Sequence, residues 1–195
     1  MLKFDEKTHE YFLDDTNLPS VTKIIESAGL IDSYWFTEEA QTRGKYIHEA
    51  CAMLVEGKLN WGSVDPLIVN YVKAFEAFLH DIKGSLKIKE CEKWKYSKEF
   101  MYAGTPDLIV EFAGGGEGVI DIKTGTSMPW HEIQLAAYAA FISNPSDLRL
   151  YTLHLKKDGK YSLKSNKGDW RKSFQIFLNC LSIYNWKVKY LKKGK

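Results

Sequence analysis

Two aspartates and a lysine in this sequence have the types and spacing needed for phosphoryl chemistry. Asp107 begins one predicted strand, and Asp121 and Lys123 lie near the end of the next. Because Ile122 separates Asp121 from Lys123, alternation along a strand places those two side chains on one face. Two carboxylates and an ammonium at one sheet edge suit a hard cation beside a phosphate. The cation would lower the pKa of a bound water, and Lys123 would position that water or offset charge developing on the phosphate.

The same three residues have a purely structural alternative. Asp107 and Asp121 can be turn residues at strand ends, with Lys123 as their ion-pair partner. A single Asp-x-Lys pattern does not separate the two interpretations, so the surrounding elements and further motifs must do so.

A β-hairpin is the element expected to bring the two carboxylates together. Residues 107–112 and 118–123 have the composition of strands, and the Gly-rich segment 113–117 joins them. A turn this short makes the strands antiparallel neighbours, so Asp107 and Asp121 can converge at one end of the pair.

The remaining pattern predicts a single α/β domain over residues 1–195. Helices are expected where apolar residues recur at helical spacing behind capping residues, and strands where they alternate. The expected elements are a short strand at 11–13, helices over 21–28, 37–57 and 65–82, a strand over 86–96, the hairpin, a helix over 129–142, strands 148–155 and 161–164 around the turn Asp158-Gly159, and a helix after Asp169. Residues 1–85 form a mainly helical part, 86–165 the sheet with its helix, and 166–195 a C-terminal helix and basic tail.

Five short motifs, in order, resemble the RecB-like branch of the PD-(D/E)XK nuclease superfamily. They are Leu18-Pro-Ser-Val-Thr22, Gly44-x-x-x-His48, Gly104-Thr-Pro-Asp107, Asp121-x-Lys123 and Gln134-x-x-x-Tyr138. The first resembles the opening of phage exonucleases and of the mitochondrial genome-maintenance exonuclease. The resemblance covers roughly residues 10–155. It implies a restriction-endonuclease-like core, in which N-terminal helices precede a mixed central sheet (αβββαβ) with flanking helices.

The resemblance also implies a metal site. His48, Asp107, Asp121 and the backbone carbonyl of Ile122 would hold Mg²⁺ or Mn²⁺, and the imidazole favours Mn²⁺. Taken alone, His48 would be read as a solvated helix histidine, so its role as a ligand comes from the resemblance.

Four further residues receive roles in the same way. Lys123 would be the catalytic lysine, and Glu92, 15 residues before Asp107, would hold a second metal or a bound water. Gln134 and Tyr138 share a helix face and would orient Lys123 or contact the scissile phosphate. Outside this context, Gln134 would be read as a surface polar residue and Tyr138 as a residue at the edge of the core.

Two cofactor classes are not expected. The three scattered cysteines, Cys51, Cys91 and Cys180, cannot hold an iron–sulphur cluster on four cysteines, and they are read as reduced thiols. The phosphate-binding pattern G-x-x-x-x-G-K-[ST] is absent, so neither a nucleotide cofactor nor a helicase motor is expected.

A formal net charge of +2 conceals an uneven distribution. Residues 151–195 carry 12 basic and 2 acidic residues, whereas residues 1–150 carry 15 basic and 23 acidic ones. Such asymmetry indicates contact with nucleic acid or a membrane surface. The candidate DNA-contacting residues are Arg43, Lys45, Trp130, Lys187, Lys189, Lys192 and Lys193. The alternatives are a solvated helix face for Arg43 and Lys45, core packing for Trp130 and a solvated tail for the terminal lysines.

These features predict a metal-dependent deoxyribonuclease, in particular an exonuclease of phage or bacterial DNA recombination, repair or replication. The alternatives are a non-catalytic nucleic-acid-binding module of the same fold and a restriction-type endonuclease. The expected partners are DNA, as single strands or duplex ends, and a recombination or single-strand-binding protein. No apolar run approaches roughly 18 residues and no secretory signal is visible, so a cytoplasmic protein with no membrane contact is expected.

Overall fold

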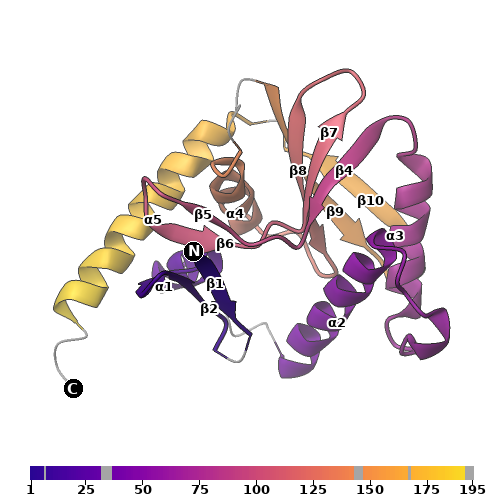
Figure 1. Ribbon diagram of the computed structural model, residues 1–195, viewed down its shortest axis with the longest axis horizontal. Coiled ribbons are helices and arrows are strands. Elements are labelled where there is room, and N and C mark those ends of the chain that lie inside the picture. The colour runs from indigo at the N-terminus through magenta and orange to yellow at the C-terminus, as the bar shows by residue number, and fades with distance from the viewer. Residues whose placement is uncertain (7, 32–36, 143–146, 167, 192–195) are drawn as a thin grey trace.

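A five-stranded mixed sheet forms the centre of the fold (Figure 1). In order of pairing its strands are β10 (Tyr161–Ser165), β9 (Leu148–Leu155), β8 (Glu117–Lys123), β7 (Leu108–Phe112) and β4 (Leu86–Cys91). Strands β8 and β9 run parallel, and the other neighbours are antiparallel. The computed structural model describes residues 1–6, 8–31, 37–142, 147–166 and 168–191.

Helices cover both faces of this sheet (Figure 1). On one face α2 (Glu38–Val55) and α3 (Val69–Asp81) pack over Ile120 and Ile122 of β8. On the other face α1 (Val21–Ser27), α4 (Trp130–Ala139) and α5 (Trp170–Tyr190) pack around Val119. Because side chains alternate along a strand, Asp121 and Lys123 lie on the same face as Val119, toward α4. The predicted mixed α/β architecture is therefore observed, and β9 and β10 form the hairpin expected over 148–155 and 161–164.

The N-terminal segment contains more strand than the sequence predicts. Three short strands, β1 (Leu2–Asp5), β2 (Glu10–Leu13) and β3 (Thr16–Leu18), form an antiparallel sheet. Tyr11 and Leu18 of this sheet share a small core with Ala103, and the Ala103 N–H donates to the Pro19 carbonyl at 3.0 Å. These strands are three or four residues long and pack on a partner remote in sequence, so local periodicity shows only the segment at 11–13.

The single strand expected over 86–96 is interrupted, which corrects that prediction. Strand β4 ends at Cys91, and the register of its pairing with β7 shifts between Ile88 and Glu90. Glu92 has a φ of 49°, which turns the chain away from the central sheet. The chain then forms β5 (Lys95–Ser97), which pairs with β6 (Tyr102–Gly104) in a separate two-stranded sheet.

The predicted helix starts are confirmed where a side chain caps them. Ser20 Oγ accepts from the Lys23 N–H, Thr37 Oγ1 accepts from the Ala40 N–H, and Asp169 Oδ1 accepts from the Arg171 N–H, at 3.2, 3.2 and 3.1 Å. These bonds satisfy N–H groups that lack a partner within the first helical turn.

Other helix ends differ from the prediction. Helix α3 begins at Val69, four residues later than expected, because residues 65–68 form a turn. In this turn the Ile68 N–H donates to the Asp65 carbonyl at 3.0 Å. A short 3₁₀ helix, η2 (Trp61–Ser63), precedes the turn. Helix α4 ends at Ala139, earlier than expected. Helix α5 continues to Tyr190, so Lys187 and Lys189 are helical rather than part of a flexible tail. In the part of the chain that the structure describes, no helix is long and apolar enough to cross a membrane.

Substitution of Gly104 tests how closely β6 packs against α4. A Cβ at this buried glycine would lie 2.8 Å from Tyr138 Cε1 and 3.1 Å from Val21 Cγ2. We expect Gly104→Ala to lower the free energy of unfolding by about 1–3 kcal/mol through overpacking, measured by urea denaturation. Gly44→Ala, in α2 with no atom within 4 Å, is the matched control and should raise it by up to about 1 kcal/mol. Equal stability of the Gly104→Ala variant and the unaltered protein would contradict this packing.

Candidate functional site

The β7–β8 hairpin places the two aspartates of the sequence motif side by side. Leu108 pairs with Ile120, so Asp107, one residue before β7, faces Asp121 in β8. The antiparallel pairing predicted from the short turn is confirmed. Both residues are buried, with Asp107 6% and Asp121 1% exposed. Buried carboxylates need compensating charge or N–H donors, and their neighbours supply both.

Asp107 contacts residues from three different parts of the chain. The Ile122 N–H donates to its Oδ2, and its Oδ1 lies 3.3 Å from His48 Nδ1. Its backbone carbonyl accepts from the Glu92 N–H at 3.0 Å. The β7–β8 hairpin, α2 and the end of β4 therefore meet at this one residue.

His48, Glu92 and Asp107 form the cluster that suits a metal ion. One ligand atom from each residue lies within 4.8 Å of the other two, and His48 Nδ1 is 3.1 Å from Glu92 Oε1. The positive φ of Glu92 costs of the order of 1 kcal/mol or more, and the Asp107 carbonyl maintains it through its bond to the Glu92 N–H. This conformation directs the carboxylate at His48. One imidazole nitrogen and two carboxylates fit Mg²⁺ or Mn²⁺.

Asp121 belongs to a second group, centred on Lys123. Lys123 Nζ lies 2.6 Å from Asp121 Oδ2 and donates to Gln134 Oε1 at 2.9 Å. Gln134 Nε2 in turn donates to the Tyr138 hydroxyl at 3.3 Å. Gln134, which was expected to orient Lys123, is hydrogen-bonded to it directly. Tyr138 contacts Gln134 and acts on Lys123 only through that residue. The expected ligand set contained Asp121, whereas the cluster that the structure brings together contains Glu92 in its place. Asp121 lies next to Asp107 through the pairing of β7 with β8.

The protonation of these groups follows from their shared burial. Burial opposes the charged imidazolium, yet Asp107 and Glu92 outweigh it and raise the pKa of His48 to about 10. Burial acts to raise the pKa of Asp107, but the cations of His48 and Lys123 hold it below its usual range. Burial, and then Asp107, raise the pKa of Glu92. Burial raises the pKa of Asp121 to about 6, against the effect of Lys123. At neutral pH a protonated His48 therefore balances the carboxylates of its cluster.

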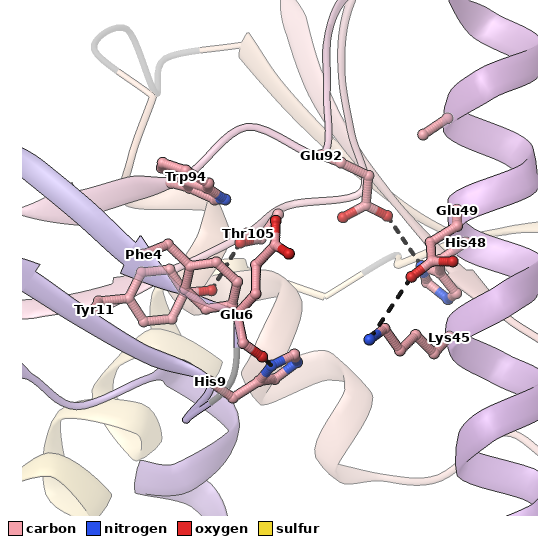
Figure 2. A pocket seen from close by; sticks show the side chains of 11 residues that line it. Phe4, Glu6, His9, Tyr11, Lys45, His48, Glu49, Glu92, Trp94 and Thr105 are labelled. Atoms are coloured by element: carbon pink, nitrogen blue, oxygen red, sulfur yellow. Dashed lines mark hydrogen bonds and ion pairs between the residues drawn. The ribbon is translucent and has the colours of Figure 1, made fainter. Parts of the chain in front are cut away.

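The cluster opens into a pocket of about 450 Å³ between α2 and the N-terminal sheet (Figure 2). Its lining residues are Phe4, Glu6, His9, Tyr11, Lys45, His48, Glu49, Ala52, Glu92, Trp94 and Thr105. The Tyr11 hydroxyl and Thr105 Oγ1, 2.7 Å apart, join the N-terminal sheet to the segment that carries Asp107. Sequence reasoning missed Phe4, Tyr11 and Trp94, because no local pattern connects the first strands or the break at Glu92 with Asp107.

The candidate DNA-contacting residues of α2 face different surroundings. Lys45 lines the pocket, and its Nζ is 3.8 Å from Glu49 Oε1. Arg43 is half-buried in a separate hollow that it shares with acidic residues, namely Glu38, Glu39 and Asp65. Only Lys45 of this pair therefore faces the metal cluster.

Three other candidates for DNA contact, Trp130, Lys187 and Lys189, do not line the pocket. Trp130 is only 9% exposed, with its ring centroid 5.6 Å from Lys123 Nζ, so it packs in the core instead of offering a face to a base. Lys187 donates through Nζ to the Ser27 carbonyl, and Lys189 Nζ lies 5.1 Å from the Tyr190 ring centroid. Lys192 and Lys193 fall outside the described residues.

Neither a protein-family model nor a curated protein matches the sequence, whereas several solved structures do. The chain is similar to an alkaline exonuclease from Laribacter hongkongensis, with 14% identity over 91% of this chain and 95% of the other, at a TM-score of 0.44. The same exonuclease in complex with dAMP matches with 14% identity over the same shares, at a TM-score of 0.41. A protein named SSO0001 matches with 17% identity over 92% of this chain and 84% of the other, at a TM-score of 0.37. The functional conclusion rests on the chain's own residues.

Binding of a divalent cation should release a proton from His48. A ligating imidazole must be neutral, whereas the raised pKa of His48 keeps it protonated at pH 7.5. We expect Mn²⁺ binding to release close to one proton, and its affinity to rise about tenfold per pH unit between pH 7 and 8. Calorimetry in buffers of different ionisation enthalpy measures the released proton.

Two variants make this measurement specific. His48→Gln should abolish the proton release and weaken binding, whereas His80→Gln, on the exposed end of α3, should change neither. Mn²⁺ binding that is independent of pH and unaffected by His48→Gln would show that His48 is not a ligand.

Proposed function

We propose that this protein is a metal-dependent nuclease that hydrolyses phosphodiester bonds in DNA. One observation carries the proposal: the His48–Glu92–Asp107 cluster lies directly beside the Asp121–Lys123 pair, at the ends of paired strands β7 and β8. A set of metal donors next to a positioned ammonium is the combination that phosphodiester hydrolysis requires.

In this proposal His48, Glu92 and Asp107 hold Mg²⁺ or Mn²⁺, with Asp121 and the Ile122 carbonyl as further ligands. The bound ion supplies a water of lowered pKa and offsets charge on the phosphate. The buried position of Asp107 and its three contacts fix the cluster before any ligand arrives. Such preorganisation means that little reorganisation is needed during the reaction.

Lys123 is the residue we assign to the reacting phosphate. Its Nζ is held between Asp121 Oδ2 and Gln134 Oε1, and its side chain is 17% exposed. An ammonium fixed in this way can offset negative charge that develops on a phosphate oxygen, or hold the attacking water. Tyr138 stabilises the orientation of Gln134 and is a positioning residue rather than a catalytic one.

The finer parts of the proposal are an exonuclease mode of action and a role in recombination, repair or replication of DNA. They rest on the motif resemblance. DNA strands or duplex ends are then the substrate, with Lys45 beside the site and Arg43, Lys187, Lys189, Lys192 and Lys193 as outer phosphate contacts. Trp130 is not among the contacts because it is buried.

Replacing Lys123 should separate cleavage from binding. We expect Lys123→Gln to lower the rate of DNA cleavage by about 100-fold or more, because the charge facing the phosphate is lost, while DNA affinity stays within a few-fold. The matched control is Lys89→Gln, an exposed lysine of β4 paired with Glu117, which should cleave at the unaltered rate.

The assay uses end-labelled linear single-stranded, linear duplex and circular DNA with Mg²⁺, Mn²⁺ or EDTA. Cleavage of the linear forms alone supports an exonuclease, and cleavage of circles supports an endonuclease. Unchanged cleavage by the Lys123→Gln variant would contradict the assigned site, and no cleavage of any form by the unaltered protein would favour a non-catalytic binding module.

The C-terminal lysines should contribute to the salt dependence of DNA binding. Deleting residues 192–195 removes three lysines and leaves α5 intact. We expect the slope of log affinity against log salt to become shallower by about 0.7–0.9 for each lysine that contacts a phosphate. Fluorescence anisotropy at several salt concentrations measures the slope, and an unchanged slope would show that these lysines make no contact.

A further inference from the structure

The pocket wall opposite His48 is built from aromatic side chains (Figure 2). Phe4 lies at its centre, with ring centroids 4.7 Å from Tyr11, 5.5 Å from Trp94 and 5.2 Å from His9. Trp94 is 47% exposed, so part of this apolar surface is open to solvent within the pocket. We call Phe4, His9, Tyr11 and Trp94 the aromatic wall.

Short chain segments connect this wall to the metal-binding cluster. Trp94 follows Glu92 by two residues, after the positive φ that ends the direction of β4. On the other side, the Tyr11 hydroxyl is hydrogen-bonded to Thr105, two residues before Asp107. The aromatic wall therefore has a defined position relative to the residues that would face a scissile phosphate.

Carboxylates lie on both sides of the pocket. Glu6 lies beside the aromatic wall, whereas Lys45 and Glu49, 3.8 Å apart, are on α2 with His48, which contacts Glu92 (Figure 2). Lys45 is the only lysine or arginine among the residues that line the pocket in the described structure. Glu6 repels a phosphate from the wall, whereas a cation bound by His48 and Glu92 would attract it to the opposite side, where Lys45 also lies. A neutral, planar group has no such penalty against the rings.

From this arrangement we infer that the aromatic wall is a subsite for one unpaired nucleobase of the strand being cut. The inference rests on the proposed nuclease function and adds a substrate class to it. A base stacks on Phe4 or Trp94 only after leaving its partner strand, so the subsite favours single-stranded DNA or a frayed duplex end. The volume of about 450 Å³ lies within the range of about 300–1,000 Å³ that is usual for small-ligand pockets.

An abasic oligonucleotide tests this directly, because it keeps the phosphate and removes only the base. Binding is measured by anisotropy with the Lys123→Gln variant in Mg²⁺, using a labelled single strand with one abasic position scanned through the first four nucleotides from either end. At one position we expect affinity to fall about 5- to 150-fold, which corresponds to the roughly 1–3 kcal/mol of a single base–aromatic contact.

Removing a ring of the wall should abolish that dependence on the base. In the same background, Trp94→Ala or Phe4→Leu should weaken binding of the intact strand by a similar factor, and the abasic substitution should then cost nothing more. Trp94→Phe retains a stacking surface and should preserve most of the affinity. Trp61→Ala, at an exposed tryptophan of η2 outside the pocket, should leave both affinities unchanged.

The outcomes separate the two proposals. If the Trp94→Ala and Phe4→Leu variants lose the same factor on abasic strands as on intact ones, the base subsite is wrong even when the unaltered protein cuts DNA. If the unaltered protein cuts no DNA with Mg²⁺ or Mn²⁺, the nuclease proposal fails, and the binding comparison still decides whether a base occupies the wall.

Discussion

Two carboxylates buried side by side are the constraint on which the rest of this site depends. The pairing of Leu108 with Ile120 fixes Asp107 next to Asp121, out of contact with bulk water. Removing an ion from water costs several kcal/mol unless nearby groups compensate. His48 from α2 and Lys123 from β8 supply the two positive charges, and each aspartate lies next to one of them. The buried aspartates thus depend on one charge from a helix, His48 of α2, and one from the sheet itself, Lys123 of β8.

This compensation prepares the site for a cation. The proton on His48 offsets part of the negative charge of Asp107 and Glu92, and a bound divalent cation would take over that role. On the face of the sheet covered by α4, Gly104 leaves room for the Tyr138 ring. The Tyr138 hydroxyl accepts from Gln134, and Gln134 accepts from Lys123. The packing of Tyr138 against Gly104 is therefore linked to the Lys123 ammonium by two hydrogen bonds, through Gln134. The packing that stabilises α4 also orients Lys123.

The sequence predicted those features that depend on local chemistry. The turn at 113–117 fixed the hairpin, and Ser20, Thr37 and Asp169 marked helix starts because each caps an N–H three residues or fewer ahead. Alternation placed Asp121 and Lys123 on one face, and they form an ion pair.

The features that could not be predicted depend on contacts distant in sequence. The positive φ of Glu92 is maintained by the Asp107 carbonyl, and nothing around residue 92 signals the end of the strand. The N-terminal strands are stabilised by Ala103 and Thr105, so their aromatic residues become visible as a pocket wall only in the folded chain. The roles of His48 and Glu92 came from resemblance rather than spacing, because their proximity requires α2 to pack against the sheet.

Isotopic labelling of the reaction products tests the central claim most directly. DNA is incubated with the unaltered protein and Mn²⁺ in ¹⁸O-enriched water, and the cleavage products are analysed by mass spectrometry. Metal-dependent hydrolysis predicts cleavage products, nucleotides or shorter strands, that carry one ¹⁸O atom on each newly formed terminal phosphate in Mn²⁺, and no cleavage in EDTA. Absence of cleavage in Mn²⁺, cleavage in EDTA at the same rate, or products without ¹⁸O would contradict metal-dependent phosphodiester hydrolysis by this protein.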